Sequence, residues 1–192
     1  MSDAASLAVR WSGAADEAAI VSLFERDGSP CFCRYWHFEG DKNAWLARCA
    51  GEPEVNRDAL SVDLRSGADG ARALVALTPQ GQCVGWMKLA PRRAVPKLRK
   101  LPVYRALDLG DDDGVWSVGC FLVDEAWRGR GVARRLVSEI PRALAPLGAR
   151  AVEAYPRQGL HAAEAWTGPA KVFEAFTRVG GDDAYPVLRL VL

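Results

Sequence analysis

The residues best placed for chemistry form one short run, Arg128-Gly129-Arg130-Gly131-Val132-Ala133. Its small residues let the backbone approach a ligand closely. An amphipathic helical pattern follows, and the first turn of a helix carries amides without partners inside the helix and the positive end of its dipole. Arg134 and Arg135 add positive charge. The run therefore predicts a cradle for a phosphate or pyrophosphate. The alternative is a surface turn with solvated arginines.

The elements on both sides of this run should hold it in place. Residues 115–123 are nearly all apolar or small, which predicts a central strand buried on both faces. After the run, a helix should extend to about residue 147. Pro141 should bend this helix, Gly148 should end it, and Ala151 to Ala154 should form the next strand.

The rest of the chain predicts a mixed α/β architecture. Further strands are expected at residues 7–11, 73–77, 83–89 and 187–192. Helices are expected at residues 16–26, 41–49, 54–65 and about 169–178. Strands that precede, interleave with and follow helices indicate a mixed sheet flanked by helices. A chain of this length favours one domain over residues 1–192.

Two other phosphate-binding patterns fit poorly. A dinucleotide fingerprint would use Gly129 and Gly131, with Glu153 at a strand end 22 residues after Gly131. Arg134 is too bulky for the third glycine position, and the run lies too late in the chain for a second nucleotide-binding half. A P-loop needs a Lys-Ser or Lys-Thr pair, which does not follow the run.

The segment resembles the GNAT superfamily of N-acetyltransferases. The acetyl-CoA signature of that family is Arg/Gln-x-x-Gly-x-Gly/Ala, and residues 128–133 match every fixed position. Residues 120–127 resemble the family's lead-in from the preceding strand. Residues 148–156 resemble the next strand of one bacterial subgroup, residues 168–180 its last helix, and residues 31–36 an N-terminal feature of it.

The resemblance implies a mixed, mostly antiparallel sheet of six or seven strands, splayed between strands 4 and 5 and flanked by helices, with acetyl-CoA in the gap. Main-chain groups of Phe121, Leu122 and Val123 would pair with the pantetheine arm. The phosphates would be held by Arg128, Gly129, Arg130, Gly131, Val132, Ala133 and Arg134. No metal is implied. The partners are acetyl-CoA and an amine acceptor, with the protein as a monomer or homodimer.

Acid–base groups are less clearly marked. The family often protonates the departing thiolate with a tyrosine in a Tyr-x-x-x-Gly-Phe pattern, but Phe176 stands at that position here. Tyr155 and Tyr185 are the substitutes. Glu153 is the best carboxylate for a general base, because it sits in an apolar strand beside the expected splay. A solvated Glu153 and packed tyrosines are the alternatives.

Three further side chains are alternative candidates for the catalytic groups. Cys120 is expected to be core, with a covalent acetyl-cysteine as the other reading. His37 and His161 are weaker candidates for the base, since a lone histidine in a loop says little.

Two groups of residues are candidates for binding the acceptor. Early aromatics are expected either in the core or in the acceptor wall: Phe32, Tyr35, Trp36, Phe38 and Trp45. A basic, proline-containing run at residues 92–105 is either a solvated loop or a flap that attracts anions.

Composition narrows the function classes. The 25 Lys and Arg against 24 Asp and Glu give a formal net charge of +1, which argues against general nucleic-acid binding. No apolar run is long enough to span a membrane, and the start resembles no secretory signal. The odd number of cysteines indicates reduced thiols in a cytoplasmic protein. A zinc site at Cys31, Cys33 and His37 is the alternative, but the Cys-x-Cys spacing is unusual.

The sequence thus predicts an acetyl-CoA-dependent N-acetyltransferase that transfers an acetyl group directly to an amine of a small molecule or peptide. The alternative, which Phe176 suggests, is a catalytically weak protein that binds or senses acyl-CoA.

Overall fold

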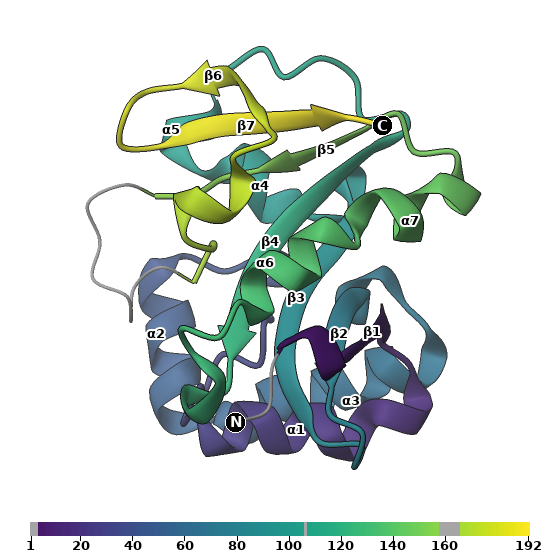
Figure 1. Cartoon of the computed structure of the whole chain (residues 1–192). Helices are drawn as coiled ribbons and strands as arrows, with labels where there is room; N and C mark the ends of the chain where they lie inside the picture. Colours follow the sequence, from purple (N-terminus) through teal and green to yellow (C-terminus); the bar gives the residue numbers. More distant parts are fainter. Residues whose placement is uncertain (1–3, 106, 158–165) are drawn as a thin grey trace.

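One seven-stranded sheet organises the computed structural model, which describes residues 4–105, 107–157 and 166–192 (Figure 1). The strands are β1 (Ala8–Trp11), β2 (Ala73–Leu77), β3 (Cys83–Pro91), β4 (Val115–Val123), β5 (Ala151–Ala154), β6 (Thr177–Gly181) and β7 (Pro186–Val191). Their spatial order is β1-β2-β3-β4-β5-β7-β6. Neighbouring strands are antiparallel except β4 and β5, which are parallel. This is the predicted mixed, mostly antiparallel sheet.

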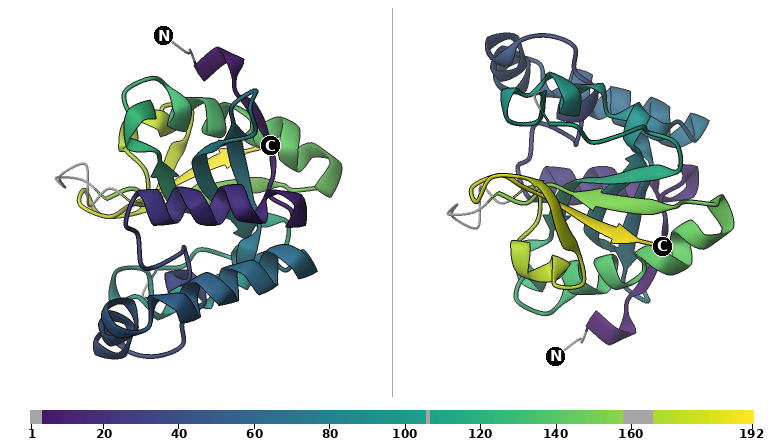
Figure 2. Two further views of the ribbon diagram at one scale, coloured as in Figure 1. Left: turned by 90° about the horizontal axis from the view of Figure 1, so that it is seen from below. Right: turned by 90° about the horizontal axis from the view of Figure 1, so that it is seen from above.

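Helices cover both faces of the sheet (Figure 2). The α-helices are α1 (Glu17–Arg26), α2 (Lys42–Gly51), α3 (Pro53–Ser66), α4 (Pro96–Lys100), α5 (Pro102–Arg105), α6 (Val132–Ser138) and α7 (Ile140–Leu144). Helices α1 and α3 lie on one face, and α6 and α7 lie on the other. No described helix is long and apolar enough to span a membrane.

Each face of the sheet has its own apolar core. The first contains side chains of α1 and α3 packed on Trp86, with Leu98 of α4 and Trp36 from the segment between α1 and α2. The second contains side chains of α6 and α7 packed on Met87 and Phe121. Neighbouring residues of β3 and β4 thus point into different cores, as the alternation of a strand requires.

The sheet splays apart between β4 and β5, as expected. The two strands pair only from Val115 with Ala151 to Val118 with Ala154, whereas β4 continues to Val123. On its other side, β4 pairs with β3 through a bulge, where Gly119 and Cys120 lie opposite the single residue Lys88. A bulge disrupts the ladder locally and increases the twist of the strand. The second half of β4 therefore leaves β5.

Three segments depart from the expected elements. The predicted helix at 169–178 is wrong: a four-residue 3-10 helix at Ala170–Phe173 is followed by β6, because Thr177 to Gly181 pair with β7. The helix after residue 131 is divided at Glu139, directly before the predicted bend at Pro141. The basic run at 92–105, expected to be a loop or flap, contains α4 and α5.

Contact between α6 and the sheet depends on Gly85 of β3. A Cβ atom at this position would lie 2.7 Å from Val132 Cγ1 and 3.1 Å from Ala76 Cβ, so α6 would have to move. We expect Gly85→Ala to lower the free energy of unfolding by about 1–3 kcal/mol, the usual cost of overpacking. Urea denaturation measures this change. Gly13→Ala is the control, since a Cβ there meets nothing within 4 Å; an equal loss in both variants would contradict this account.

Candidate functional site

A cleft of about 1660 Å³ opens where β4 leaves β5. Residues 120–123 of β4 form its floor, and the loop that follows β4 forms one end. Its sides include residues of α1 and of the segment from Ser29 to Leu46, together with Trp166 and Val172. The predicted ligand run lies at this cleft, since all its residues except Arg130 line it.

Two glycines shape the turn between β4 and α6. Gly129 and Gly131 have φ values of +72° and +85°, in the left-handed region that favours glycine. A Cβ at Gly129 would meet nothing within 4 Å, so this turn faces open space. Helix α6 begins directly afterwards, and its first backbone bond runs from Arg135 N to Gly131 O. The amides before that bond have no partner inside the helix, as the predicted cradle requires.

The arginines around the turn have different partners. Arg128 donates to Asp27 and, at 3.1 Å, to the carbonyl of Val123. Partial burial raises the pKa of Asp27, although the positive charge of Arg128 opposes this shift. Arg134 is 71% exposed at the cleft, and its nearest carboxylate, Glu174, is 4.0 Å away. Of the two arginines beside the turn that line the cleft, Arg128 and Arg134, the second is therefore freer to meet an anion.

Arg130 and Arg135 point to other partners. The guanidinium of Arg130 lies 5.7 Å from the ring centre of Trp127, and Arg135 donates to Glu139 at 2.9 Å. Neither lines the cleft. The sequence predicted the cluster of arginines, but only the structure shows which of them face the cleft.

One backbone amide of β4 that was expected to bind the ligand is hydrogen-bonded within the protein. The amide of Phe121 donates to the carbonyl of Trp166 at 2.7 Å, on the side that β5 has left. The predicted pairing of the Phe121 amide with a pantetheine arm is therefore not open in this structure. Leu122 and Val123 line the same stretch of cleft.

The family model of the acetyltransferase (GNAT) family matches residues 33–166, which include β4, the glycine turn and β5. The chain belongs to the GNAT family of acetyltransferases. No curated protein sequence matches the chain.

Solved structures share the fold of this GNAT protein. A GCN5-related N-acetyltransferase from Kribbella flavida is 22% identical, with a TM-score of 0.58 over 98% of this chain and 99% of that one. PaiA N-acetyltransferase from Thermoplasma acidophilum, in complex with coenzyme A, is 9% identical, with a TM-score of 0.55 over 97% and 99%. YncA from Salmonella typhimurium, with acetyl-CoA, is 17% identical, with a TM-score of 0.51 over 97% and 94%.

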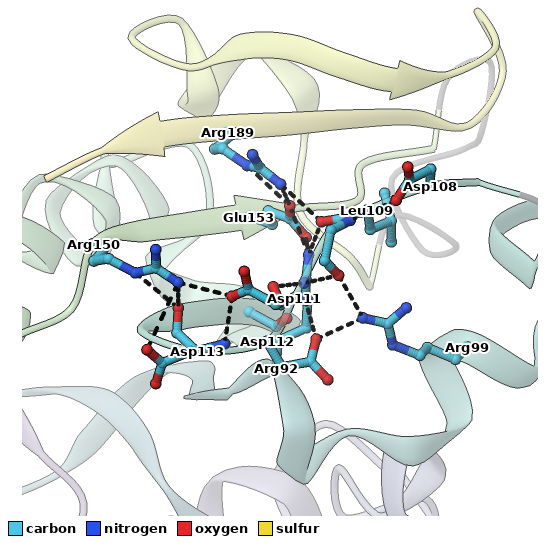
Figure 3. Close-up of polar contacts among 12 residues, drawn as sticks. Arg92, Arg99, Asp108, Leu109, Asp111, Asp112, Asp113, Arg150, Glu153 and Arg189 are labelled. Atoms are coloured by element: carbon cyan, nitrogen blue, oxygen red, sulfur yellow. Dashed lines mark hydrogen bonds and ion pairs between the residues drawn. The ribbon is translucent and has the colours of Figure 1, made fainter.

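Glu153, the predicted base of this GNAT protein, does not line the cleft. It lies between Arg92 and Arg189 (Figure 3). Its side chain is fully buried and accepts hydrogen bonds from three residues. Arg92 Nη1 donates to both carboxylate oxygens at 3.0 Å, and Arg189 Nε donates to Oε1 at 3.0 Å. The phenol of Tyr155 donates to Oε2 at 2.8 Å. The carboxylate is therefore enclosed by its partners and is not exposed to the cleft.

Tyr155, the predicted acid, is equally remote from the cleft. Its hydroxyl lies between Glu153 and Ser117 Oγ, which is 3.0 Å away. Burial, together with the charge of Glu153, raises the pKa of Tyr155 well above its usual value. Glu153 and Tyr155 thus belong to one buried polar cluster that joins β4 to β5. We therefore do not propose either residue as a catalytic group.

The basic run at 92–105 is largely used within the fold. Arg92 also donates to the carbonyls of the acidic turn after Leu109, and Arg99 donates to Asp112 at 2.7 Å (Figure 3). Lys97 donates to the carbonyl of Gly40 at 2.7 Å and lies 5.3 Å from the ring centre of Tyr35. The expected solvated loop or anion-attracting flap is thus replaced by a structural support.

Among the described residues, Phe176, Tyr185 and His37 do not line the cleft either. Phe176 packs in the second core, 5.2 Å from the ring centre of Phe173. The Tyr185 hydroxyl lies 3.2 Å from Arg157 Nη2, and neither residue lines the cleft. Burial lowers the pKa of His37 to about 3, with help from nearby positive charges, so it is a poor base. His161 lies outside the described residues.

The aromatic wall is divided between core and cleft. Tyr35 and Trp45 line the cleft, with ring centres 5.6 Å apart, and Trp166 lies 5.6 Å from Tyr35 on its other side. Phe32 and Trp36 are buried in the first core. Residues 35 and 45 come from different segments, so helical or strand spacing could not single them out.

Three thiols also face the cleft: Cys31, Cys33 and Cys120. Sequence reasoning treated Cys31 and Cys33 as structural or zinc-binding and considered chemistry only at Cys120. Among the described residues, no group of three or more potential ligands is arranged to hold a metal. The sequence feature that could have drawn attention to Cys33 is the Cys31-Phe32-Cys33 run. That Cys33 and Cys120 line the same cleft depends on the fold and could not be read from the sequence.

Glu153 is expected to matter for stability. Glu153→Leu removes the buried acceptor shared by Arg92, Arg189 and Tyr155 and leaves Arg92 with Asp112 as its remaining carboxylate partner, so we expect the free energy of unfolding to fall by about 3–5 kcal/mol. Asp111→Asn is the control, because its ion pair with Arg150 is exposed and should contribute at most about 1 kcal/mol. Urea denaturation of both variants tests this account. A Glu153→Leu protein as stable as the control would contradict it.

Proposed function

We propose that this GNAT protein is an acetyl-CoA-dependent N-acetyltransferase. The observation that carries the proposal is the left-handed Gly129 and Gly131 turn at the end of a cleft that follows the unpaired half of β4. A diphosphate needs close backbone approach, and an extended pantetheine arm needs a long groove. The cleft offers both to one ligand. PaiA and YncA, which are similar to this chain, bind coenzyme A and acetyl-CoA.

The charges in the cleft support the same ligand. Arg128 and Arg134 lie beside the glycine turn, and Lys171 also lines the cleft. Phe121, Leu122 and Val123 offer an apolar floor beyond them. We therefore assign the phosphates to the turn of residues 128–134 and the pantetheine arm to β4.

We propose an amine of a small molecule or peptide as the acceptor. It would enter beside Tyr35, Trp45 and Trp166, whose rings pack together and line the cleft. Direct attack of a neutral amine on the thioester is the simplest route. The five cysteines are free, which supports the cytoplasmic location that we propose. We also propose that residues 1–192 act as one domain.

The second candidate is a protein that binds or senses acyl-CoA with little catalysis. It is favoured by the apolar packing of Phe176 and by the distance of Glu153 and Tyr155 from the cleft. Turnover separates this candidate from the first.

Acetyl-CoA binding tests the cradle. Gly131→Glu puts a side chain at a φ of +85° and a carboxylate beside the phosphates, so we expect affinity to fall more than about tenfold, or 1.4 kcal/mol. Titration calorimetry measures this loss. Gly81→Glu is the matched control, because Gly81 has a φ of +83° in a hairpin turn outside the cleft. Equal affinities in the two variants would remove the cradle assignment.

Catalysis is tested by the release of CoA thiol across a panel of amines. We expect turnover above the hydrolysis background with at least one small amine or peptide, and a lower rate in Gly131→Glu. Because the wall is aromatic, the panel should pair each arylalkyl amine with an aliphatic amine of equal length. Tight acetyl-CoA binding without turnover on any amine would instead favour the sensing protein.

A further inference from the structure

A short segment of irregular backbone lies against β4 beyond the last residue that pairs with β5. The segment comprises residues 166–169, which we call the strap. The amide of Phe121 donates to the carbonyl of Trp166 at 2.7 Å. Pairing of β4 with β5 has already ended at Val118. The strap therefore takes the place of a neighbouring strand at the amide of Phe121.

The strap also packs closely on the side chain of Phe121. A Cβ atom on Gly168 would lie 2.7 Å from Cε2 and 2.8 Å from Cδ2 of the Phe121 ring, so a larger residue would force the strap or the ring to move. Gly168 has a φ of +93°, in the region that favours glycine. The Phe121 ring is itself packed against Phe173, with ring centres 6.0 Å apart. One backbone hydrogen bond and one close contact thus hold the strap at Phe121.

One polar group of the strap is left unsatisfied. Thr167 is 3% exposed, and its Oγ1 atom has no hydrogen-bond partner among the described residues. A buried hydroxyl without a partner costs free energy, because it has lost its hydrogen bonds to water. The strap therefore lies against β4 without satisfying all of its own polar groups, which lowers the free energy needed to displace it.

Trp166 connects the strap to the aromatic residues of the cleft. Its ring centre lies 5.6 Å from those of Tyr35 and Trp36, and both Trp166 and Tyr35 line the cleft. The carbonyl of Trp166 meanwhile occupies the Phe121 amide. A backbone amide offers a single hydrogen atom, so a ligand that pairs with this amide must displace the carbonyl. The ring of Trp166 would then move relative to Tyr35.

We propose that the strap is an internal competitor of the pantetheine arm, and that acetyl-CoA binds by displacing it from β4. This proposal rests on the proposed function, which assigns the arm to β4. In the free protein the carbonyl of Trp166 accepts from the Phe121 amide, and in the complex an amide carbonyl of the arm takes its place. A site that is open in only a fraction of the molecules binds with an affinity reduced by that fraction. The strap therefore lowers the affinity for acetyl-CoA and links binding to a movement of Trp166.

The first test opens the strap with Gly168→Ala. The added Cβ meets the Phe121 ring and sits at a positive φ, and both costs are relieved when the strap leaves β4. We expect titration calorimetry to give a Kd for CoA that is lower than in wild type, by up to about tenfold. Gly148→Ala is the matched control, because its φ is +62°, a Cβ there meets nothing within 4 Å, and it lies outside the cleft. Its Kd for CoA should equal that of wild type.

A second ligand separates the arm from the phosphates. The nucleotide half of CoA carries the phosphates without the pantetheine arm, so its binding at the glycine turn should not require displacement of the strap. We expect the nucleotide half to bind wild type and Gly168→Ala with equal affinity, in contrast to CoA. An equal gain in affinity for both ligands would mean that Gly168→Ala acts on the phosphate end, and the proposal would fail.

Two variants of Trp166 examine the other contact of the strap. Trp166→Ala removes the ring that packs on Tyr35 and Trp36, so it should also lower the Kd for CoA, and it tests the proposal even where Gly168→Ala does not fold. Trp166→Phe isolates the fluorescence of Trp166. We expect CoA to change the emission of wild type more than that of Trp166→Phe, whereas the nucleotide half should change the emission of both proteins equally.

Three results would overturn the proposal. The first is an unchanged Kd for CoA in both Gly168→Ala and Trp166→Ala, which would mean that the arm binds without displacing the strap. The second is a weaker affinity for CoA in these variants, which would make the strap part of the CoA site. Both results leave the proposed function intact, because wild type binds CoA in each case. The third is an absence of CoA binding in wild type and Gly168→Ala alike, in which case the proposed function fails as well.

Discussion

The rest of the site depends on where β4 and β5 stop pairing. A buried polar cluster holds their last paired residues together: Glu153 binds Arg92 and Arg189, and Tyr155 bridges Glu153 to Ser117. Removing one partner of a buried charge pair is costly, so this end of the sheet cannot open without a large loss of stability. Beyond it, the bulge at Gly119 and Cys120 turns β4 away. The cleft is the space between a clamped end and a diverging strand.

The buried polar cluster also fixes the order in which the bulge, the floor and the glycine turn follow one another along the cleft. From Val118 onward, β4 first presents the bulge with Cys120, then the floor at residues 121–123, and finally the glycine turn. Helix α6, which begins at that turn, is held against β3 by close contact between Val132 and Gly85. A ligand whose phosphates lie at the turn therefore has a defined direction, and its far end lies toward the bulge.

The sequence was most informative where a pattern is local. The apolar stretch at 115–123, the glycine spacing at 129 and 131, and Pro141 were enough to predict β4, the turn and the broken helix, because each depends on neighbouring residues. Glu153 was misjudged because a carboxylate in a buried strand can be either a reactive group or half of an ion pair. Its partner Arg92 lies 61 residues away, in a run that looked like a solvated loop. The 169–178 segment was misjudged because strand pairing with β7 overrode its helical pattern.

That Cys33 and Cys120 line the same cleft could not be predicted either, because the two residues lie far apart in the sequence. The family's usual acid would come from the segment of Phe176, which packs in the second core. The titratable groups nearest the bulge instead belong to the first core, where Cys33, Cys120 and Lys88 meet. Burial lowers the pKa of Lys88 to about 8, and the negative charge of an ionised Cys33 opposes this shift. The polar groups nearest the bulge therefore lie on the opposite face of the sheet from Phe176, the face to which Tyr35 also belongs.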